Sequence, residues 1–254
     1  MTADLWQPLD AALSRWRAAG RTPAFWLRDD DAVAPTPALQ RLLDLAHAHA
    51  VPLALAVIPV GATQALADLL RADRATTVLV HGWSHRNHAP AGEKKCELGL
   101  HRPQEAVLGE LQASLRRIDA LFSDQALPVL VPPWNRIDAG LVGHLAPLGY
   151  RAMSVFGPSR HGGFPMLNTT VDIMDWRGSR GCRPVADIVT EIVQQLDAGL
   201  AEAQTRPIGL LTHHLVHDEA AWRFLGDLFA VTRRAGLDWK AVGPLLEEVV
   251  APTA

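Results

Sequence analysis

The sequence predicts an α/β fold and favours a closed barrel over an open sheet. Short apolar runs alternate along the chain with amphipathic stretches of helical period, the pattern of repeated strand–helix units. The runs at 51–60 and 76–80 are apolar on both faces, as in parallel strands that are covered on both sides. Polar clusters follow at least five of the strands. A barrel gathers all its strand ends on one face, whereas an open sheet binds ligands mainly at one switch point.

Each expected element has its own local signal. Leucines at helical spacing predict a first helix that ends at Gly20, and Pro103 stands at the first position of a later helix. The strands are short apolar runs, and several lead directly into polar residues. The segment 86–102 predicts a long loop. Helices are expected at 4–19, 37–49, 62–73, 103–122, 138–147, 184–203, 217–235 and 239–250, strands at 23–27, 51–60, 76–80, 127–131, 150–155, 166–173 and 207–212, and a second loop at 157–165.

The composition limits the class of protein and its partners. The chain has 254 residues, 48% of them hydrophobic, and a net charge of −3, which excludes a disordered chain and predicts one domain over 1–254. This near-neutral charge gives no electrostatic reason to expect a nucleic-acid partner or an anionic membrane. No run of about 18 apolar residues, the length that spans a bilayer, occurs. No oligomeric state is predicted.

The expected compartment is the cytoplasm. The N-terminal residues do not place a basic segment before an apolar one, so no secretory signal is expected. Cys96 and Cys182 are too few for a disulfide framework, which fits a reducing compartment.

His81 and His85 lie four residues apart, directly after the strand at 76–80. If the chain turns helically there, both imidazoles come to one side, an arrangement that suits two ligands of Zn²⁺ or a similar ion. The alternative is a pair of surface or capping histidines in a polar loop.

Asp29, Asp30 and Asp31 follow the strand at 23–27. Three adjacent carboxylates repel one another, so a cation or hydrogen-bond donors must compensate. The alternative is structural, with Asp31 capping a turn that leads to Pro35. One carboxylate and two imidazoles would make a three-ligand site with an open position for water, and a neighbouring carboxylate could serve as the general base.

Three further clusters follow strands. His213 and His214 offer an imidazole that could protonate a leaving group, cap a helix or add a metal ligand. The segment 172–176 offers carboxylates that could orient a histidine, and the rigid turn at 132–135 presents an aromatic ring. Each cluster alone has a structural explanation, but together they supply every role in metal-assisted hydrolysis.

In this order the clusters resemble the motifs of the polysaccharide deacetylases, carbohydrate esterase family 4 and its superfamily. The family's TFDDG, HxxxH, Arg-Pro-Pro-Tyr-like, DxxDW and Leu-x-His motifs correspond here to LRDDD (27–31), HGWSH (81–85), VPPWN (131–135), DIMDW (172–176) and LTH (211–213). The resemblance covers about residues 22–235. It implies a single distorted (β/α)₇ barrel with flanking N- and C-terminal helices. It also implies a divalent metal ion, zinc first, with cobalt, manganese and nickel as other candidates.

The resemblance also implies a role for each matching residue. The metal ligands would be Asp30, His81 and His85, and the general base would be Asp29. The general acid would be His213, oriented by Asp175. The remaining positions would contact the substrate: Asp31, Trp134, Trp176, Leu211 and His214, of which Trp176 and Leu211 line the acetyl pocket and Trp134 walls the groove.

Two departures from the family pattern leave these roles open. Asp31 stands where the family has glycine, so a second register is available in which Asp30 is the base and Asp31 the ligand. His214 competes with His213 for the acid role, because adjacent residues of a strand point to opposite sides.

Two more departures affect the walls of the site. Val131 stands where the family has the arginine that holds the catalytic base, and three other arginines could replace it: Arg28, Arg136 and Arg177. Trp134 replaces the family's tyrosine, which alters the groove wall.

The expected function is the removal of an acetyl or similar acyl group from an N-acetylated sugar or small glycan, by metal-activated water with an Asp base and a His acid. One alternative is hydrolysis of a carbon–nitrogen bond in a non-sugar amide or ureide. The other is a carbohydrate-binding relative without turnover. In the cytoplasm, a small acetylated sugar or a glycan precursor is a more accessible substrate than a wall polymer.

Overall fold

The computed structural model describes residues 3–158, 163–202 and 206–251. The strands are β1 Phe25–Ala32, β2 Leu53–Val57, β3 Thr76–His81, β4 Ala126–Val131, β5 Ala152–Met153, β6 Val171–Asp172 and β7 Ile208–Thr212. The α-helices are α1 Ala3–Ala18, α2 Pro37–Ala48, α3 Gln64–Arg71, α4 Gln104–Phe122, α5 Ala139–Val142, α6 Leu145–Leu148, α7 Val185–Ala201, α8 Glu219–Arg234 and α9 Val242–Val250. Short 3₁₀ turns follow β2, β4 and β7, at Pro59–Gly61, Pro133–Asn135 and His214–Val216.

The strands form one seven-stranded sheet in the order β5-β4-β3-β2-β1-β7-β6. Every neighbouring pair is parallel, so all the strands finish at the same end of the sheet. We call this end the mouth. In a parallel α/β fold it is the end at which ligands bind.

A short seam joins the two edges of the sheet. The segment 153–157, which begins in β5, exchanges backbone hydrogen bonds with the segment 165–169, which leads into β6. The amides of Met153, Leu167, Thr169 and Gly157 donate to the carbonyls of Pro165, Met153, Val155 and Thr169 at 2.8–3.1 Å. The predicted distorted (β/α)₇ barrel is therefore confirmed, and its distortion lies in this seam of isolated bridges.

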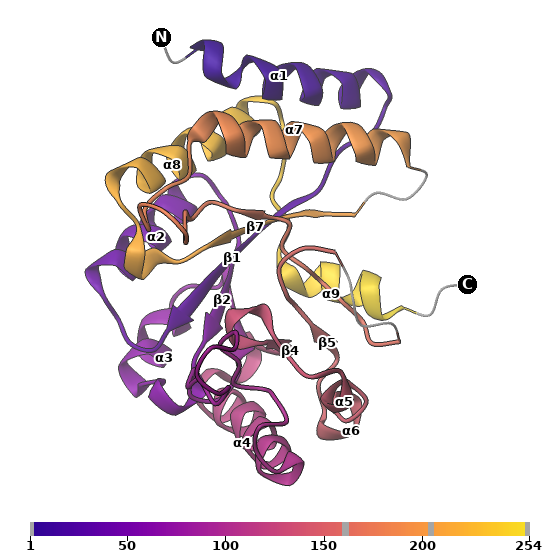
Figure 1. Ribbon diagram of the computed structural model, residues 1–254. Coiled ribbons are helices and arrows are strands. Elements are labelled where there is room, and N and C mark those ends of the chain that lie inside the picture. The colour runs from indigo at the N-terminus through magenta and orange to yellow at the C-terminus, as the bar shows by residue number, and fades with distance from the viewer. Residues whose placement is uncertain (1–2, 159–162, 203–205, 252–254) are drawn as a thin grey trace.

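Helices cover the outside of the barrel, and α9 closes the end opposite the mouth (Figure 1). Leu245 and Leu246 of α9 belong to a small apolar core inside the barrel, together with Trp26 and Leu79. A larger core lies between the strands and the outer helices. On that outer side α1 packs along α7, where the Trp16 indole donates to the Leu196 carbonyl at 2.9 Å.

The first strand alternates between these two cores. Phe25 and Leu27 face the outer helices, whereas Trp26 faces the barrel interior. Because side chains alternate along a strand, Arg28 and Asp30 share the interior face with Trp26.

Most predicted elements are confirmed to within a few residues, and four differ. The strand expected at 23–27 continues to Ala32, so the acidic run lies inside the strand rather than after it. The helix expected at 138–147 is two short helices, α5 and α6, separated at Gly143 and His144. The strands expected at 150–155 and 166–173 shrink to the two-residue β5 and β6, because the seam replaces regular pairing there. Of the loop expected at 157–165, residues 159–162 lie outside the described part of the chain. Among the described residues no helix is both long and apolar enough to cross a membrane.

The interior of the barrel leaves no room for a side chain at Gly209 of β7. A Cβ added there would lie 2.7 Å from the Thr169 Cα and 2.5 Å from the Trp26 indole nitrogen. By contrast, a Cβ at Gly226 in α8 would come no closer than 3.6 Å to its nearest neighbour, the Leu45 side chain.

We therefore expect opposite effects from two alanine substitutions. Gly209→Ala should lower the free energy of unfolding by roughly 1–3 kcal/mol, because the added methyl group overpacks the barrel. Gly226→Ala should raise it by about 0.5–1 kcal/mol, because alanine is the better helix former. Urea unfolding of both variants checks this, and equal effects would show that the barrel relaxes around position 209.

Candidate active site at the mouth of the barrel

The end of β1 presents its carboxylates in different directions. Asp30 points into the barrel, and Asp29 points to the opposite side of the sheet. Asp31 has a left-handed backbone with φ of 77°, at an irregularity in the pairing with β2 that lies between Asp29 and Ala32. This irregularity breaks the alternation, so Asp31 also reaches the mouth.

Asp31, His81 and His85 form the one group of potential metal ligands among the described residues. Their ligand atoms all lie within 4.8 Å of one another. The Nε2 atoms of His81 and His85 lie 3.0 Å and 3.3 Å from Asp31 Oδ1. The structure therefore unites the two predicted histidines with Asp31, whereas Asp30, the predicted third ligand, lies outside this group because it faces the barrel interior.

A backbone contact fixes the orientation of the His81 ring. Its Nδ1 lies 2.9 Å from the Val131 carbonyl, which can only accept a hydrogen bond, so Nδ1 carries the proton. The lone pair of the neutral ring is then on Nε2, which faces Asp31. A carbonyl behind the outer nitrogen is the usual support of a metal-binding histidine.

The three groups shift one another's pKa values. Burial alone would raise the pKa of Asp31, but the hydrogen bond from His81 and the charges of both histidines hold it well below its usual range. Burial would lower the pKa of His81, but Asp31 and Asp30 raise it. The pKa of His85 is lowered by burial and by the nearby His81.

A buried ion pair between Arg28 and Asp30 fills the barrel directly below the mouth. Arg28 Nε and Nη2 donate to the two oxygens of Asp30 at 2.9 Å and 3.0 Å. The guanidinium also donates to Ser154 Oγ at 2.7 Å and Asn135 Oδ1 at 3.1 Å. Both side chains are almost fully buried. Of the three arginines expected to replace the family's arginine, Arg28 is thus the one that binds an aspartate of the acidic run, whereas Val131 belongs to the apolar core inside the barrel.

A buried glutamate, Glu97, holds the loop that carries the two histidines. Its Oε1 accepts from the Ser84 amide at 2.7 Å and the Ser84 hydroxyl at 2.8 Å, and its Oε2 accepts from the Trp83 amide at 3.1 Å. Gly82 has φ of 58°, and a Cβ there would collide with Glu97 Oε2. Sequence reasoning missed Glu97, because one glutamate in a long charged loop carries no periodic or motif signal.

His213 lies across the mouth from the histidine pair. Its Nε2 is 4.0 Å from Asp30 Oδ2, and its ring packs edge-on against Trp176 with a centroid distance of 4.6 Å. Its Nδ1 is buried and has no hydrogen-bond partner among the described residues. Leu211, two residues earlier in β7, is fully buried beside Arg28 in the strand register.

His214 and Asp29 form a separate pair on the other side of the sheet. The Asp29 carboxylate accepts from the His214 amide at 2.8 Å and lies 2.5 Å from its Nδ1. Both side chains are completely buried. Asp29, predicted as the base, and His214, predicted as a substrate contact, therefore lie away from the mouth. The cause is the alternation that carries Asp30 and His213 inward.

The orienting role predicted for Asp175 is not supported by its position. Its carboxylate caps a turn by accepting from the Gly178 and Ser179 amides at 3.0 Å and 2.9 Å. Asp172 takes the place near the site instead: it accepts from the Trp176 indole at 2.8 Å, and the charge of His213 acts on it. Burial raises the pKa of Asp172, and the Met174 amide and His213 oppose that rise.

The turn after β4 forms the wall of the site beside the histidine pair. The Trp134 ring lies 4.3 Å from the His85 ring, centroid to centroid. Trp134 and Asn135 both have left-handed backbones, with φ of 53° and 56°. Such conformations are costly for residues other than glycine and collect at functional sites. Here they bring the Asn135 amide to Arg28 and the Trp134 ring to His85.

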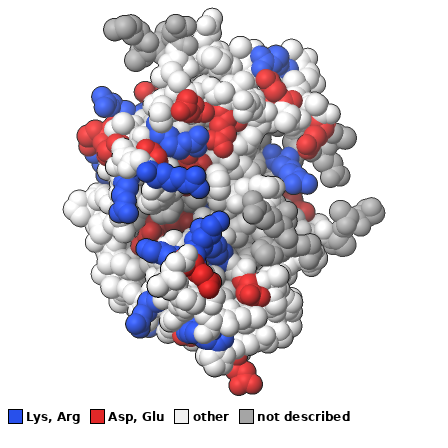
Figure 2. Space-filling model, in the orientation of Figure 1, with Lys and Arg blue, Asp and Glu red and all other residues white. Residues whose placement is uncertain are grey.

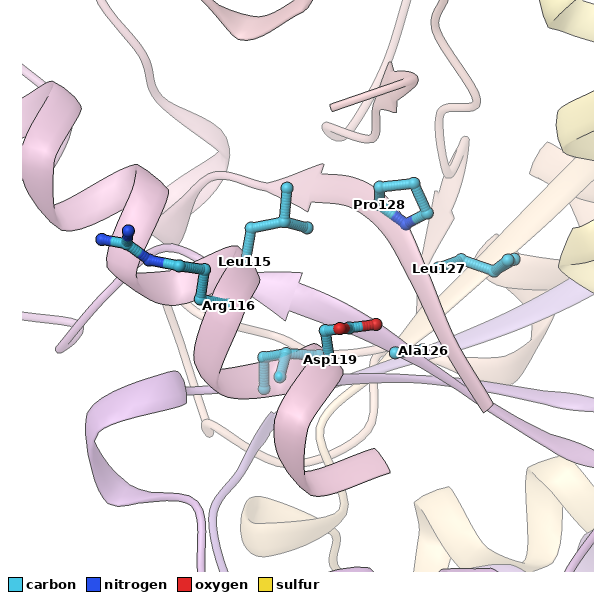
Figure 3. A pocket seen from close by; sticks show the side chains of 7 residues that line it. Leu115, Arg116, Asp119, Ala126, Leu127 and Pro128 are labelled. Atoms are coloured by element: carbon cyan, nitrogen blue, oxygen red, sulfur yellow. The ribbon is translucent and has the colours of Figure 1, made fainter. Parts of the chain in front are cut away.

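A pocket of about 290 Å³ lies away from these residues, between α4 and β4 (Figure 3). Leu115, Ile118 and Leu127 make most of its lining apolar. None of the motif residues reaches it, so the candidate site remains at the mouth.

No protein-family model matches this sequence, and no curated protein matches it. Solved structures do match. The family 4 carbohydrate esterase from Streptomyces lividans, in complex with acetate, is 16% identical, with a TM-score of 0.57 over 88% of this chain and 95% of that chain. The peptidoglycan deacetylase PdaC from Bacillus subtilis is 16% identical, with a TM-score of 0.58 over 89% and 91%.

A third match is a mutant of BA3943, described as a CE4 family pseudoenzyme with restored enzymatic activity. It is 18% identical, with a TM-score of 0.59 over 89% of this chain and 68% of that chain. The TM-scores establish a common fold, and at such low sequence identities the similarity extends to the fold alone. The chain therefore has the fold of the family 4 carbohydrate esterases, the family whose five ordered motifs its sequence resembles.

Proposed function

We propose that this protein is a metal-dependent hydrolase that removes an acetyl or similar acyl group from an N-acetylated sugar or small glycan. The observation that carries the proposal is the grouping at the mouth: three potential ligand atoms within 4.8 Å of one another, beside an inward carboxylate and a further histidine. The neighbouring structures named a carbohydrate esterase and a peptidoglycan deacetylase support the same reaction class.

Asp31, His81 and His85 fit a divalent ion in donor chemistry. One carboxylate and two imidazoles are a common three-ligand set, and zinc is its usual occupant, with cobalt, manganese or nickel as candidates. A bound divalent ion would polarise the substrate carbonyl and make a water molecule acidic enough to lose its proton near neutral pH.

Asp30 is the base in this proposal. It lies inside the barrel directly below the mouth, and Arg28 holds both of its oxygens, so its orientation is fixed for accepting a proton from a water at the site. This is the second register of the acidic motif, one residue later than the assignment that motif matching alone implies.

His213 is the acid. Its Nε2 lies 4.0 Å from Asp30, so acid and base flank one space at the mouth. Protonated His213 would give its proton to the departing amine or alcohol. Asp172 accepts a hydrogen bond from the Trp176 indole, and the Trp176 ring packs against His213, so this carboxylate lies near the proposed acid.

The walls of this space fit a small ring-shaped substrate. Trp134 and Trp176 stand beside His85 and His213, on either side of the space. Aromatic faces of this kind stack on the apolar faces of sugars. Leu211 is buried beneath, where it would contact the acyl methyl group.

Exchanging the acidic residues separates the two registers. Asp31→Asn should lose most of the bound metal. Asp30→Asn should keep the metal and lower kcat by roughly 10²–10⁴-fold, the usual effect of removing a general base. Metal content per chain is one readout. The other is the release of acetate from N-acetylglucosamine oligomers and of amine from small amides and ureides. If Asp30→Asn loses the metal and Asp31→Asn keeps it, the first assignment is correct, with Asp29 as the base and Asp30 as the ligand.

A proton and a metal ion compete for the Nε2 atom of His81, so metal affinity should depend on pH. Because Asp31 raises the pKa of His81, the metal-free protein should titrate this ring above about 6.5, its ordinary value. A proton on Nε2 blocks metal binding, so affinity should fall as the pH drops through that raised pKa. In Asp31→Asn the pKa of His81 should fall, since the hydrogen bond and the charge of Asp31 that oppose the effect of burial are gone. NMR titration of the imidazole signals checks both directions, and an unchanged pKa in the variant would contradict the assigned contact.

The buried ion pair predicts a non-additive effect on stability. Arg28→Met leaves Asp30 charged and unpartnered, which should cost roughly 3–5 kcal/mol of unfolding free energy. The double variant Arg28→Met/Asp30→Leu should recover most of that loss, since no buried charge remains. Arg15→Met, which breaks the exposed Arg15–Asp197 pair, is the control and should cost less than about 1 kcal/mol. Additive losses in the double variant would rule out a coupled pair.

A further inference from the structure

The large apolar side chains that remain exposed all gather at the mouth. Among the described residues, every large hydrophobic residue that is markedly exposed lies in a segment that follows a strand: Val60 after β2, Leu100 after β3, Phe156 after β5, Trp176 after β6, and Leu215 and Val216 after β7. These six residues, which we call the apolar rim, come from five different loops around the barrel. Exposed apolar groups concentrated at one end of a protein mark a binding surface.

Sugar binding does not account for the apolar rim. Sugars stack on flat aromatic rings, which Trp176 and Phe156 provide. Val60, Leu215 and Val216 are aliphatic and have no such face, yet Leu215 is 50% and Val216 42% exposed. Both lie in the 3₁₀ turn directly after His213, and the Val60 amide donates to the Trp83 carbonyl in the loop of the histidine pair. These aliphatic groups therefore flank the site and face solvent.

Unpaired cations share this end of the molecule. Eight basic residues lie in the loops after β3, β4 and β6. Arg102 and Arg183 are paired with glutamates, and six form no ion pair with another described residue: Arg86, Lys94, Lys95, Arg136, Arg177 and Arg180. The Lys95 Nζ lies 5.8 Å from the centroid of the Trp134 ring, at the edge of the site. Exposed cations without an ion pair also occur away from the mouth, as at Arg234 and Lys240, but in the described part of the chain no large exposed hydrophobic residue accompanies them there.

The surface charge reflects this arrangement. Figure 2 shows Lys and Arg side chains on both sides of a hollow that has acidic side chains within it. The loops after β3, β4, β6 and β7 hold more basic than acidic residues, whereas Asp30, Asp31 and Asp172 lie at the strand ends, so the net charge of −3 is unevenly distributed. A net charge near zero is thus no argument against an anionic surface as partner.

We propose that the mouth of the barrel docks onto a lipid surface that carries anionic headgroups. Apolar side chains that enter the interface, surrounded by Lys and Arg, are the two components of interfacial binding. A sheet of anionic lipid complements both at once, because its acyl region takes up the aliphatic groups and its headgroups take up the cations. Together with the proposed function, this places the acylated group of the substrate on a lipid-anchored molecule that the site meets in the membrane plane.

Vesicle sedimentation tests the docking without requiring catalysis. The probes are vesicles of phosphatidylcholine alone and vesicles in which phosphatidylserine makes up roughly a third of the lipid, enough for a strongly negative surface. We expect binding to the anionic vesicles that weakens with added salt. Binding to neither kind of vesicle would overturn the proposal, as would equal binding to both.

Two variants separate the two components. Lys94→Gln/Lys95→Gln should weaken partitioning by about 30-fold, because each cation near such a surface contributes about fivefold. Leu215→Ser/Val216→Ser should weaken it by roughly tenfold or more through lost apolar insertion. The matched control is Arg206→Gln/Lys240→Gln, two exposed cations at the opposite end: Arg206 precedes β7, and the Lys240 amide donates to the Phe25 carbonyl at the start of β1. The control should bind like the parent protein.

Hydrolysis of a water-soluble N-acetylated sugar separates the docking from the proposed function. If that substrate is hydrolysed but vesicles are not bound, the docking is wrong and the function stands. If vesicles are bound and no acylated substrate is hydrolysed, the proposed function is wrong and the docking stands. If the control variant loses binding as strongly as Lys94→Gln/Lys95→Gln, the surface used is not the mouth. Circular dichroism confirms that each variant is folded.

Discussion

The ion pair between Arg28 and Asp30 is the constraint around which the site is arranged. Two charges inside a barrel are costly unless each meets its partner with good geometry. Here the two oxygens of Asp30 face two nitrogens of Arg28, and the remaining donors reach Ser154 and Asn135. The pair therefore ties β1 to the end of β5 and to the turn after β4. The left-handed backbone at Asn135 places its side-chain oxygen where it accepts a hydrogen bond from the Arg28 guanidinium.

The two faces of β1 have different roles, one in the site and one in holding the sheet together. Inside, Asp30 stands close to His213; outside, Asp29 and His214 form a buried pair that attaches β1 to the end of β7. Adjacent residues of each strand thus supply one group to the site and one to the frame. The irregularity at Asp31 adds a third carboxylate to the mouth, beside the histidine loop that Glu97 supports.

The sequence was sufficient for the architecture and for bringing several candidate residues to the mouth. Periodicity and strand-end polarity predicted the barrel, and the motif order predicted His81, His85 and His213. The acidic run could not be assigned from its letters, because one residue of register decides which carboxylate faces inward and a bulge resets that register. Arg28 was one of three candidates, since only a three-dimensional neighbourhood distinguishes them. Glu97 and Asp172 act through contacts between distant or irregular segments, which leave no period in the sequence.

The seam between β5 and β6 determines where this barrel opens locally. Isolated bridges between two-residue strands hold it, whereas longer ladders hold β1, β2 and β3. Local opening is easiest where ladder hydrogen bonds are fewest, so amide exchange should begin here. Ser154 lies on this seam and bonds the guanidinium that orients Asp30. A momentary opening of the seam would therefore weaken the contact between Ser154 and Arg28 and, through it, the position of the Asp30 carboxylate.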